Sequence, residues 1–248
     1  MAQDPKPSHS TLYNALFVPG LILGGLILIA LVVLAFGDKL ADNGGGSADG
    51  ERRVSEQLMA RFESEYDAKG MAVGEADAPV VMREFADYQC PACGAFADTA
   101  KRIREEYVAD GRVRFVFFDF PLPMHQHAHE AAQAARCAAR ADRFWPYHDR
   151  LFETQREWAR ESDATGFFYD LAVQTEVPLE PFKRCLSQDA TSAVVDENAQ
   201  IARDVGAVAT PTILIGDRVF SGATGYDTLK REIENRLAAA TAGQDAAQ

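Results

Sequence analysis

The Cys-Pro-Ala-Cys stretch at residues 90–93 lies where a strand pattern gives way to a helix pattern, and this junction constrains the fold more than any other feature of the chain. Residues 80–85 alternate between the two faces of a strand. Across residues 93–109, apolar side chains recur every three or four positions, as they do on the buried side of a helix. Pro91 fits the first helical position, where its missing N–H costs no hydrogen bond. We therefore expect the two cysteines at the N-terminus of a helix that follows a strand.

This position has consequences for the sulfur chemistry. Cys90 lies where free backbone N–H groups and the helix dipole favour a thiolate over a thiol. Cys93 is one turn further along, on the buried side, so the two sulfurs can close a small disulfide ring. An exposed, activated sulfur in front of a shielded one is the arrangement that thiol–disulfide exchange requires.

The same cysteine spacing also occurs in zinc sites and in inert structural disulfides. A zinc site needs a second pair of ligands, normally another CxxC or two histidines. The remaining cysteines, Cys137 and Cys185, stand alone and far apart in the sequence. The strand–CxxC–helix order therefore favours a redox-active pair over either alternative.

The charge balance narrows the classes of partner. The chain of 248 residues has 25 basic and 37 acidic residues and a net charge of −12. This balance argues against nucleic-acid binding and against docking to anionic lipid through a basic patch. The four cysteines form an even number, which is compatible with two disulfides in an oxidising compartment.

The N-terminal region predicts a membrane anchor. Residues 15–36 contain no charged residue and would form a helix of about 33 Å, long enough to cross a bilayer. A cleaved signal peptide has a shorter apolar region, so an uncleaved single span is expected. Residues 1–14 then form a cytoplasmic N-terminus, and residues 37–69 form a glycine-rich linker and a short helix. We place the C-terminal part outside the cytoplasm, because its sulfur chemistry requires oxidising surroundings.

The rest of the chain predicts one α/β domain at residues 70–240. It begins with a parallel β-α-β unit, whose strand, helix and strand are predicted at residues 80–85, 93–109 and 113–118. Several helices without strand signals occupy about residues 127–205. A Thr-Pro pair, a β-hairpin and a last helix follow, and residues 241–248 are predicted to be a disordered tail.

This order of elements resembles the thioredoxin fold, and the inserted helices resemble the DsbA-like branch of that family, in particular its membrane-anchored bacterial forms. The markers of the resemblance are Glu84-Phe85, Asp87-Tyr88-Gln89-Cys90-Pro91-Ala92-Cys93, Phe144-Trp145, Tyr147-His148-Asp149, Gly206 and Thr210-Pro211-Thr212. The implied fold class is α/β: a thioredoxin fold with an inserted all-helical subdomain, preceded by a single N-terminal transmembrane helix.

The resemblance implies how a substrate would bind. In that family the proline that matches Pro211 is cis and faces the CxxC, which leaves the Thr210 backbone free to pair with an extended substrate segment. Pro91 and Ala92, between the two cysteines, complete the implied substrate-binding set. The alternative for Pro211 is a trans turn proline at the start of a strand.

Glu84 shares its strand face with two apolar residues, so it is expected to be a buried carboxylate close to the CxxC. Burial would raise its pKa and suit it to exchange a proton with Cys93, a role given to an acid near this position in thioredoxin-like proteins. The alternatives are a surface acid or a salt-bridge partner of Arg83 or Arg114.

Cys137 and Cys185 look like the positions at which anchored relatives often carry a second disulfide within the helical insertion. The resemblance therefore implies a structural disulfide, and two separate buried thiols are the alternative. A metal site at His125, His127 and His129 is conceivable from their spacing. We expect no metal there, because these residues precede a helix in a loop and family members have histidines near this place without a catalytic duty.

Together these expectations describe a membrane-tethered thiol–disulfide oxidoreductase that forms disulfides in extracytoplasmic proteins through the Cys90–Cys93 pair, without another cofactor. Its substrates would be proteins with thiols or disulfides, and the resemblance implies re-oxidation by a quinone-linked membrane partner. One departure matters: Ala92 stands where the best-known oxidases have a histidine that stabilises the thiolate. A reductase or isomerase direction therefore stays open. Two further alternatives, from other classes, are a metal-binding chaperone and a non-catalytic partner-binding module.

Overall fold

The computed structural model describes residues 52–246. Three predicted parts lie outside these residues: the cytoplasmic N-terminus at 1–14, the membrane span at 15–36, and residues 37–51 of the segment predicted as a linker and short helix. Among the helices that are described, none combines the length and the apolar character needed to cross a bilayer.

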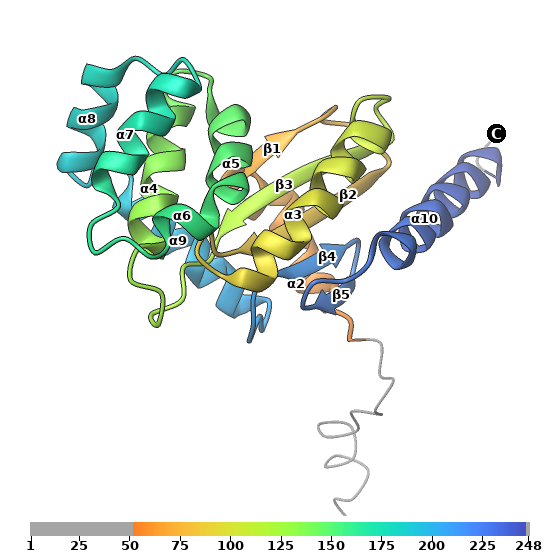
Figure 1. Cartoon of the computed structure of the whole chain (residues 1–248). Coiled ribbons are helices and arrows are strands. Elements are labelled where there is room, and N and C mark those ends of the chain that lie inside the picture. The colour runs from red at the N-terminus through yellow and green to blue at the C-terminus, as the bar shows by residue number, and fades with distance from the viewer. Residues whose placement is uncertain (1–51, 247–248) are drawn as a thin grey trace, which may run out of the picture. The chain divides into compact units, whose positions relative to one another are not determined.

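A five-stranded mixed sheet forms the centre of the domain, in the order β1-β3-β2-β4-β5 (Figure 1). Its strands are β1 (Met71–Val73), β2 (Val80–Ala86), β3 (Val113–Asp119), β4 (Thr212–Ile215) and β5 (Arg218–Ser221). β2 and β3 are parallel, with Val80 opposite Val113, whereas the other neighbouring strands are antiparallel. The predicted β-α-β unit and C-terminal hairpin are both present, and β2, which leads into the CxxC, is the central strand.

Helices cover both faces of this sheet, because apolar side chains alternate along its strands. On one face, Met82 packs in a core with α3 (Pro91–Ile103) and α10 (Tyr226–Ala246). On the other face, Phe85 packs with residues of α2 (Glu56–Ser64) and of a helix near the end of the insertion. Since both faces are covered, every residue of β2 from Met82 onward is buried, including the charged ones.

The helical insertion predicted at residues 127–205 lies between β3 and β4. Its helices are α4 (Ala128–Ala139), α5 (Phe144–Glu153), α6 (Gln155–Trp158), α7 (Thr165–Gln174), α8 (Leu179–Ser187) and α9 (Ser192–Asp204). Figure 1 shows most of them grouped beside one end of the sheet, in green to cyan. A disulfide joins Cys137 in α4 to Cys185 in α8, which is the pairing that the resemblance implied.

A buried ion pair ties the insertion to the sheet. Arg136 in α4 donates from Nε to Oδ2 of Asp119, the last residue of β3, at 2.6 Å. The same guanidinium donates from Nη2 to Oδ1 of Asn198 in α9 at 2.6 Å, and from Nη1 to the Lys69 carbonyl at 3.1 Å. Arg136 is 7% exposed, and Asp119 and Asn198 are fully buried. Arg136, Asp119 Oδ2 and Asn198 Oδ1 therefore bind one another where water does not reach, whereas Asp119 Oδ1 has no hydrogen-bond partner among the described residues.

The structure differs from the sequence prediction in several elements. β1 is an edge strand of three residues, too short for its periodicity to be recognised. The helix predicted at 93–109 is divided into α3 and a π-helical turn, η2 (Arg104–Val108). α10 continues to Ala246, past the predicted start of the disordered tail at 241, because the alanine-rich sequence after Leu237 has a high helix propensity.

Candidate active site

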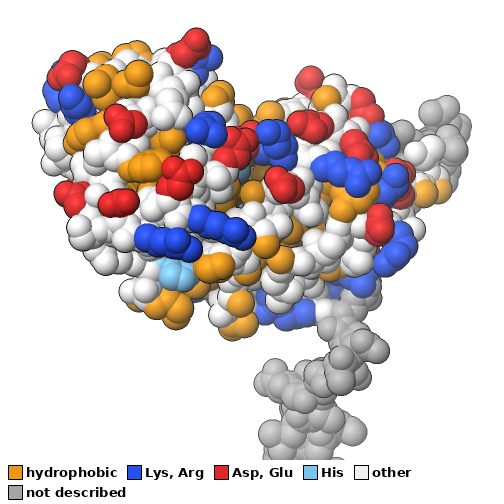
Figure 2. Space-filling model, viewed as in Figure 1, with side chains coloured by type: hydrophobic (Ala, Val, Ile, Leu, Met, Phe, Trp, Pro, Cys, Tyr) orange, Lys and Arg blue, Asp and Glu red, His pale blue; other side chains and the backbone are white. Residues whose placement is uncertain are grey.

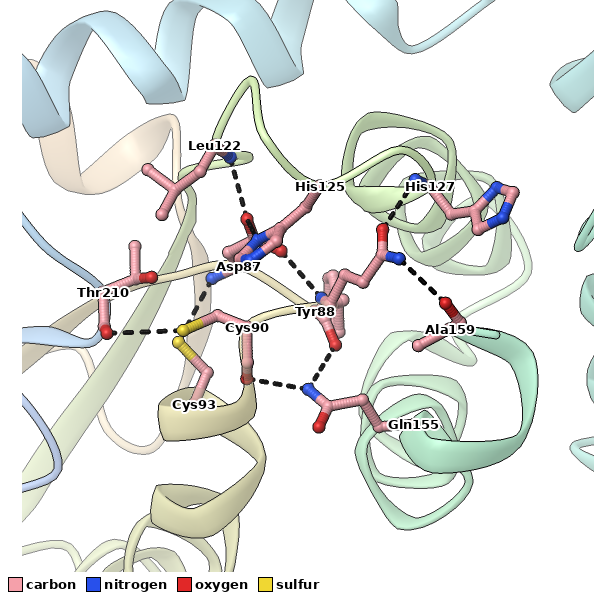
Figure 3. A network of polar contacts seen from close by, with 11 residues as sticks. Asp87, Tyr88, Cys90, Cys93, Leu122, His125, His127, Gln155, Ala159 and Thr210 are labelled. Atoms are coloured by element: carbon pink, nitrogen blue, oxygen red, sulfur yellow. Dashed lines mark hydrogen bonds and ion pairs between the residues drawn. The ribbon is translucent and has the colours of Figure 1, made fainter. Parts of the chain in front are cut away.

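The two cysteines of the CxxC lie at the N-terminus of α3 (Figure 3). Cys90 is the N-cap residue, in an extended conformation, and Pro91 is the first residue of the helix. Both cysteines are free thiols in this structure. Cys93 is fully buried, whereas Cys90 keeps 8% of its surface exposed. Cys90 is thus the more accessible of the two, but it is far more covered than the exposed sulfur that the sequence predicted.

The cover over Cys90 comes from the loop before β4. The peptide bond between Thr210 and Pro211 is cis, as the resemblance implied, and a trans turn proline is therefore excluded. The Cys90 sulfur lies 3.5 Å from the Thr210 carbonyl oxygen, to which it donates a hydrogen bond when it is protonated. Two segments separated by 120 positions in the chain are therefore in direct contact at the CxxC (Figure 3).

Hydrogen bonding and burial separate the pKa values of the two thiols. Hydrogen bonding from the Cys93 side chain is the main cause that lowers the pKa of Cys90 from 9.0 to about 5. The Thr210 side chain and the backbone N–H groups of Ala92 and Cys93 act in the same direction, against the effect of burial. Burial raises the pKa of Cys93 well above 9.0, and its hydrogen bond to Cys90 raises it further. Near neutral pH, Cys90 is therefore a thiolate and Cys93 a thiol.

We expect the reduced protein to show a thiolate that titrates with a midpoint of about 5, measured by ultraviolet absorbance across a pH series. Replacing Cys93 with alanine should raise this midpoint, because the main donor to the Cys90 sulfur is lost. The oxidised protein, in which the pair has no free thiol, supplies the baseline. A wild-type midpoint close to 9.0, the value for an unperturbed cysteine, would contradict this assignment.

Asp87 holds the turn before the CxxC, a role that sequence reasoning missed. Its backbone N–H donates to Cys93 Sγ at 3.5 Å. Its buried carboxylate accepts the N–H groups of Gln89 at 2.7 Å and of Leu122 at 2.8 Å, and lies 2.7 Å from His125 Nδ1. One carboxylate thus joins the turn to the loop after β3 (Figure 3). The only signal in the sequence was its place within a marker of the resemblance.

Gln155, the first residue of α6, supports the same turn from the insertion. Its Nε2 donates to the Tyr88 carbonyl at 2.7 Å and to the Cys90 carbonyl at 2.8 Å (Figure 3). Gly94 lies against this side chain so closely that a Cβ there would be 2.5 Å from Gln155 Oε1. A side chain at this position of α3 would therefore push the Gln155 amide away from its present place. Nothing in the sequence connected Gln155 with the CxxC.

Glu84 is buried, as the sequence predicted, and is 1% exposed. Burial raises its pKa from 4.5 to about 8, although the charge of Arg104 opposes this change. Its Oε2 atom has no hydrogen-bond partner within the described part of the chain. Its charge raises the pKa of Cys93, so the two groups interact electrostatically.

The two arginines proposed as alternative partners of Glu84 bind other groups. Arg83 donates two hydrogen bonds of 2.6 Å to the carboxylate of Asp67. Arg114 donates to the backbone carbonyl of Ala76 at 3.4 Å. The surface and ion-pair alternatives for Glu84 therefore do not describe its environment.

The three histidines between β3 and the first turn of α4 have separate partners rather than a common site. The ring nitrogens of His125, His127 and His129 lie next to the Asp87 carboxylate, the Glu161 carbonyl and the Asp196 carboxylate, respectively. Within residues 52–246, no group of three or more His, Cys, Asp or Glu side chains is arranged to hold a metal ion.

Comparison with known proteins agrees with this geometry. A family model described as thioredoxin matches residues 67–235. Disulfide bond formation protein D of Bacillus subtilis is 32% identical over 177 residues, which cover 68% of this chain and 78% of that protein.

Two solved structures that share the fold are BdbD and α-DsbA1. Oxidised BdbD of Bacillus subtilis aligns with a TM-score of 0.63 and 28% identity, over 76% of this chain and 97% of that one. α-DsbA1 of Wolbachia pipientis aligns with a TM-score of 0.64 and 20% identity, over 71% of this chain and 94% of that one. At 20% identity the second likeness concerns the fold alone.

Proposed function

The chain belongs to the thioredoxin family as a DsbA-like thiol–disulfide oxidoreductase, and we propose that it acts as an oxidase that introduces disulfide bonds into proteins outside the cytoplasm. The observation that carries this direction is the low pKa of Cys90, about 5, which arises although Ala92 occupies the place of the oxidases' histidine. Hydrogen bonding from Cys93 and from backbone N–H groups takes the place of that histidine in stabilising the thiolate.

A lowered thiol pKa favours the reduced form of the pair. Folding lowers the pKa of Cys90 from 9.0 to about 5, so the folded dithiol releases its proton at a lower pH than the unfolded chain does. The resulting stabilisation is absent below pH 5, grows as the pH rises and is complete above pH 9. Part of it is present at pH 7, where it stabilises the dithiol relative to the disulfide. A disulfide whose reduced form is stabilised is a stronger oxidant.

The exchange begins with the Cys90–Cys93 disulfide. A substrate thiolate attacks Cys90 Sγ, the bond between the two sulfurs breaks, and Cys93 leaves and takes up a proton. A second substrate thiolate then attacks the substrate sulfur of the mixed disulfide, and Cys90 leaves as a thiolate. Two electrons pass to the cysteine pair and the substrate gains one disulfide. A leaving thiol with a low pKa makes the second step fast.

We propose that Glu84 carries the proton that Cys93 gains and loses. Its carboxyl group is buried, has a pKa of about 8 and interacts electrostatically with Cys93. A group whose pKa is near the working pH can both accept and donate a proton. Thr210, Pro211, Pro91 and Ala92 border Cys90 in the chain or in space, and we assign them to substrate binding.

We further propose that residues 15–36 tether the domain to a membrane and that a quinone-linked membrane protein re-oxidises the pair. The uncharged apolar sequence of these residues supports the tether. An oxidase needs an electron acceptor, and a tether keeps the domain near one in the same membrane. Mapping which side of the membrane the C-terminal domain occupies tests the tether and the extracytoplasmic placement together.

The reduction potential of the Cys90–Cys93 pair separates the oxidase from the alternative, a reductase or isomerase with the same site. Equilibration with glutathione redox buffers should give a value well above that of thioredoxin, about −270 mV, and toward that of DsbA, about −120 mV. The protein should also oxidise a reduced secreted protein in stoichiometric amounts. A potential near −270 mV with efficient reduction of a disulfide substrate would assign the reductase direction instead.

A further inference from the structure

A groove of about 570 Å³ runs beside the CxxC, between the start of α3 and the helices α5 and α6. Gln89 and Pro91, the neighbours of Cys90 in the chain, line one side of it. Arg156 and Arg160 line the other side. A substrate segment that places its cysteine at Cys90 would therefore have its flanking residues within reach of this groove.

Arg156 and Arg160 are exposed, and neither guanidinium has a hydrogen-bond or ion-pair partner among residues 52–246. Figure 2 shows basic side chains side by side on the surface over α6. Gln155, next to Arg156, donates to the Cys90 carbonyl, and Gln89 donates to the carbonyl of Ala159, next to Arg160. Both arginines are thus attached to segments that hold the active-site turn.

The acidic residues that line this groove do not neutralise Arg156 and Arg160. Glu153 is already paired, at 2.8 Å with Arg150 and at 3.5 Å with Lys101. Asp98 is seven residues after Pro91, which is about 10 Å along the axis of α3. The end of the groove closest to the CxxC therefore presents two positive charges that have no partner in the described part of the chain, whose full sequence has a net charge of −12.

We propose that Arg156 and Arg160 bind carboxylates of the substrate segment that flanks its reactive cysteine, so that acidic segments are the preferred substrates. The proposal rests on the proposed function, because it concerns the protein that exchanges disulfides at Cys90. Guanidinium groups suit this task, since their planar donors match a carboxylate with two parallel hydrogen bonds.

The test uses the oxidised full-length chain and three dithiol peptides that differ only in the residues beside the cysteines, which are two glutamates, two glutamines or two lysines. Single-turnover rates are divided by the rate of each peptide with the uncharged disulfide of 2-mercaptoethanol, which removes the effect of these residues on the peptide thiols themselves. We expect the glutamate peptide to react roughly tenfold faster than the lysine peptide at low ionic strength, and the ratio to fall with added salt.

The double variant Arg156→Gln, Arg160→Gln should lower the glutamate-to-lysine ratio to about 1 or below, because the net negative charge of the chain then acts alone. Arg184→Gln is the matched control, since Arg184 is another exposed arginine, in α8, outside this groove. It should keep the wild-type ratio. An equal ratio in the wild type and the double variant would overturn the proposal.

The same ratio can be measured in reverse, with the reduced protein and the disulfide forms of the peptides. If the oxidase direction fails, exchange still occurs in this direction and still reports the charge preference.

Other occupants of the groove would give different experimental results. A dimer that dissociates in the double variant would assign the groove to a second copy of the chain. Binding to phosphatidylglycerol vesicles that the double variant loses would assign it to a lipid surface. Either result without a peptide preference would overturn the proposal.

Discussion

Replacing Cys90 with serine is expected to lower the rate of disulfide exchange by at least ~10³-fold, to the uncatalysed background. Serine has nearly the same shape, but its hydroxyl is not ionised at neutral pH and forms no disulfide. The thiolate of Cys90, with a pKa of about 5, is the group that is lost. The measurement is the initial rate at which a reduced protein substrate loses its free thiols.

The Cys93→Ser variant is the informative partner of this experiment. It keeps Cys90, so it should react with a disulfide-containing substrate and then stop, because no second thiol remains to resolve the mixed disulfide. Mass spectrometry should detect this covalent adduct with Cys93→Ser and not with Cys90→Ser. An adduct on Cys93 in the Cys90→Ser variant would reverse the two roles.

Replacing Arg136 with leucine should lower the free energy of unfolding by about 3–5 kcal/mol, measured by urea denaturation of the oxidised protein. The loss is large because Asp119 would remain fully buried without the charge that now lies 2.6 Å from it. Burial raises the pKa of Asp119, and Arg136 is the main group that opposes this increase.

Two controls separate this charge effect from ordinary packing. Adding Asp119→Asn to Arg136→Leu should recover part of the lost stability, because no buried charge is then left unpaired. Arg184→Leu, at an exposed arginine, should change the free energy of unfolding by no more than about 0.5 kcal/mol. If the double variant is as unstable as Arg136→Leu alone, the buried charge is not the cause.

The parts of the fold that the sequence predicted well depend on local pattern. The strand before the CxxC, Pro91 at the first helical position and the helical insertion each follow from periodicity or from residues a few positions apart. The disulfide between Cys137 and Cys185 and the cis bond before Pro211 were expected from the family resemblance.

The contacts that the sequence did not predict join residues far apart in the chain. Asp87 contacts Leu122, 35 positions away, and Arg136 contacts Asn198, 62 positions away. When its partner is unknown, a polar residue on a helix is predicted to be solvent-exposed, because most polar residues lie on the surface. α6 has four residues, too few for any periodicity to mark it as an element. These contacts only become visible when the insertion is folded against the sheet.

Through the two hydrogen bonds of Gln155, the helical insertion and the sheet domain together hold the active-site turn. The Gln155 amide binds the backbone carbonyls on either side of Gln89. A tilt of α6 would therefore move the Cys90 carbonyl as well. The inserted helices therefore cannot be removed without loss of contacts to the active-site turn. A shortened chain that kept the sheet, the CxxC and the cis proline would lack the Gln155 amide, which fixes the backbone of Cys90.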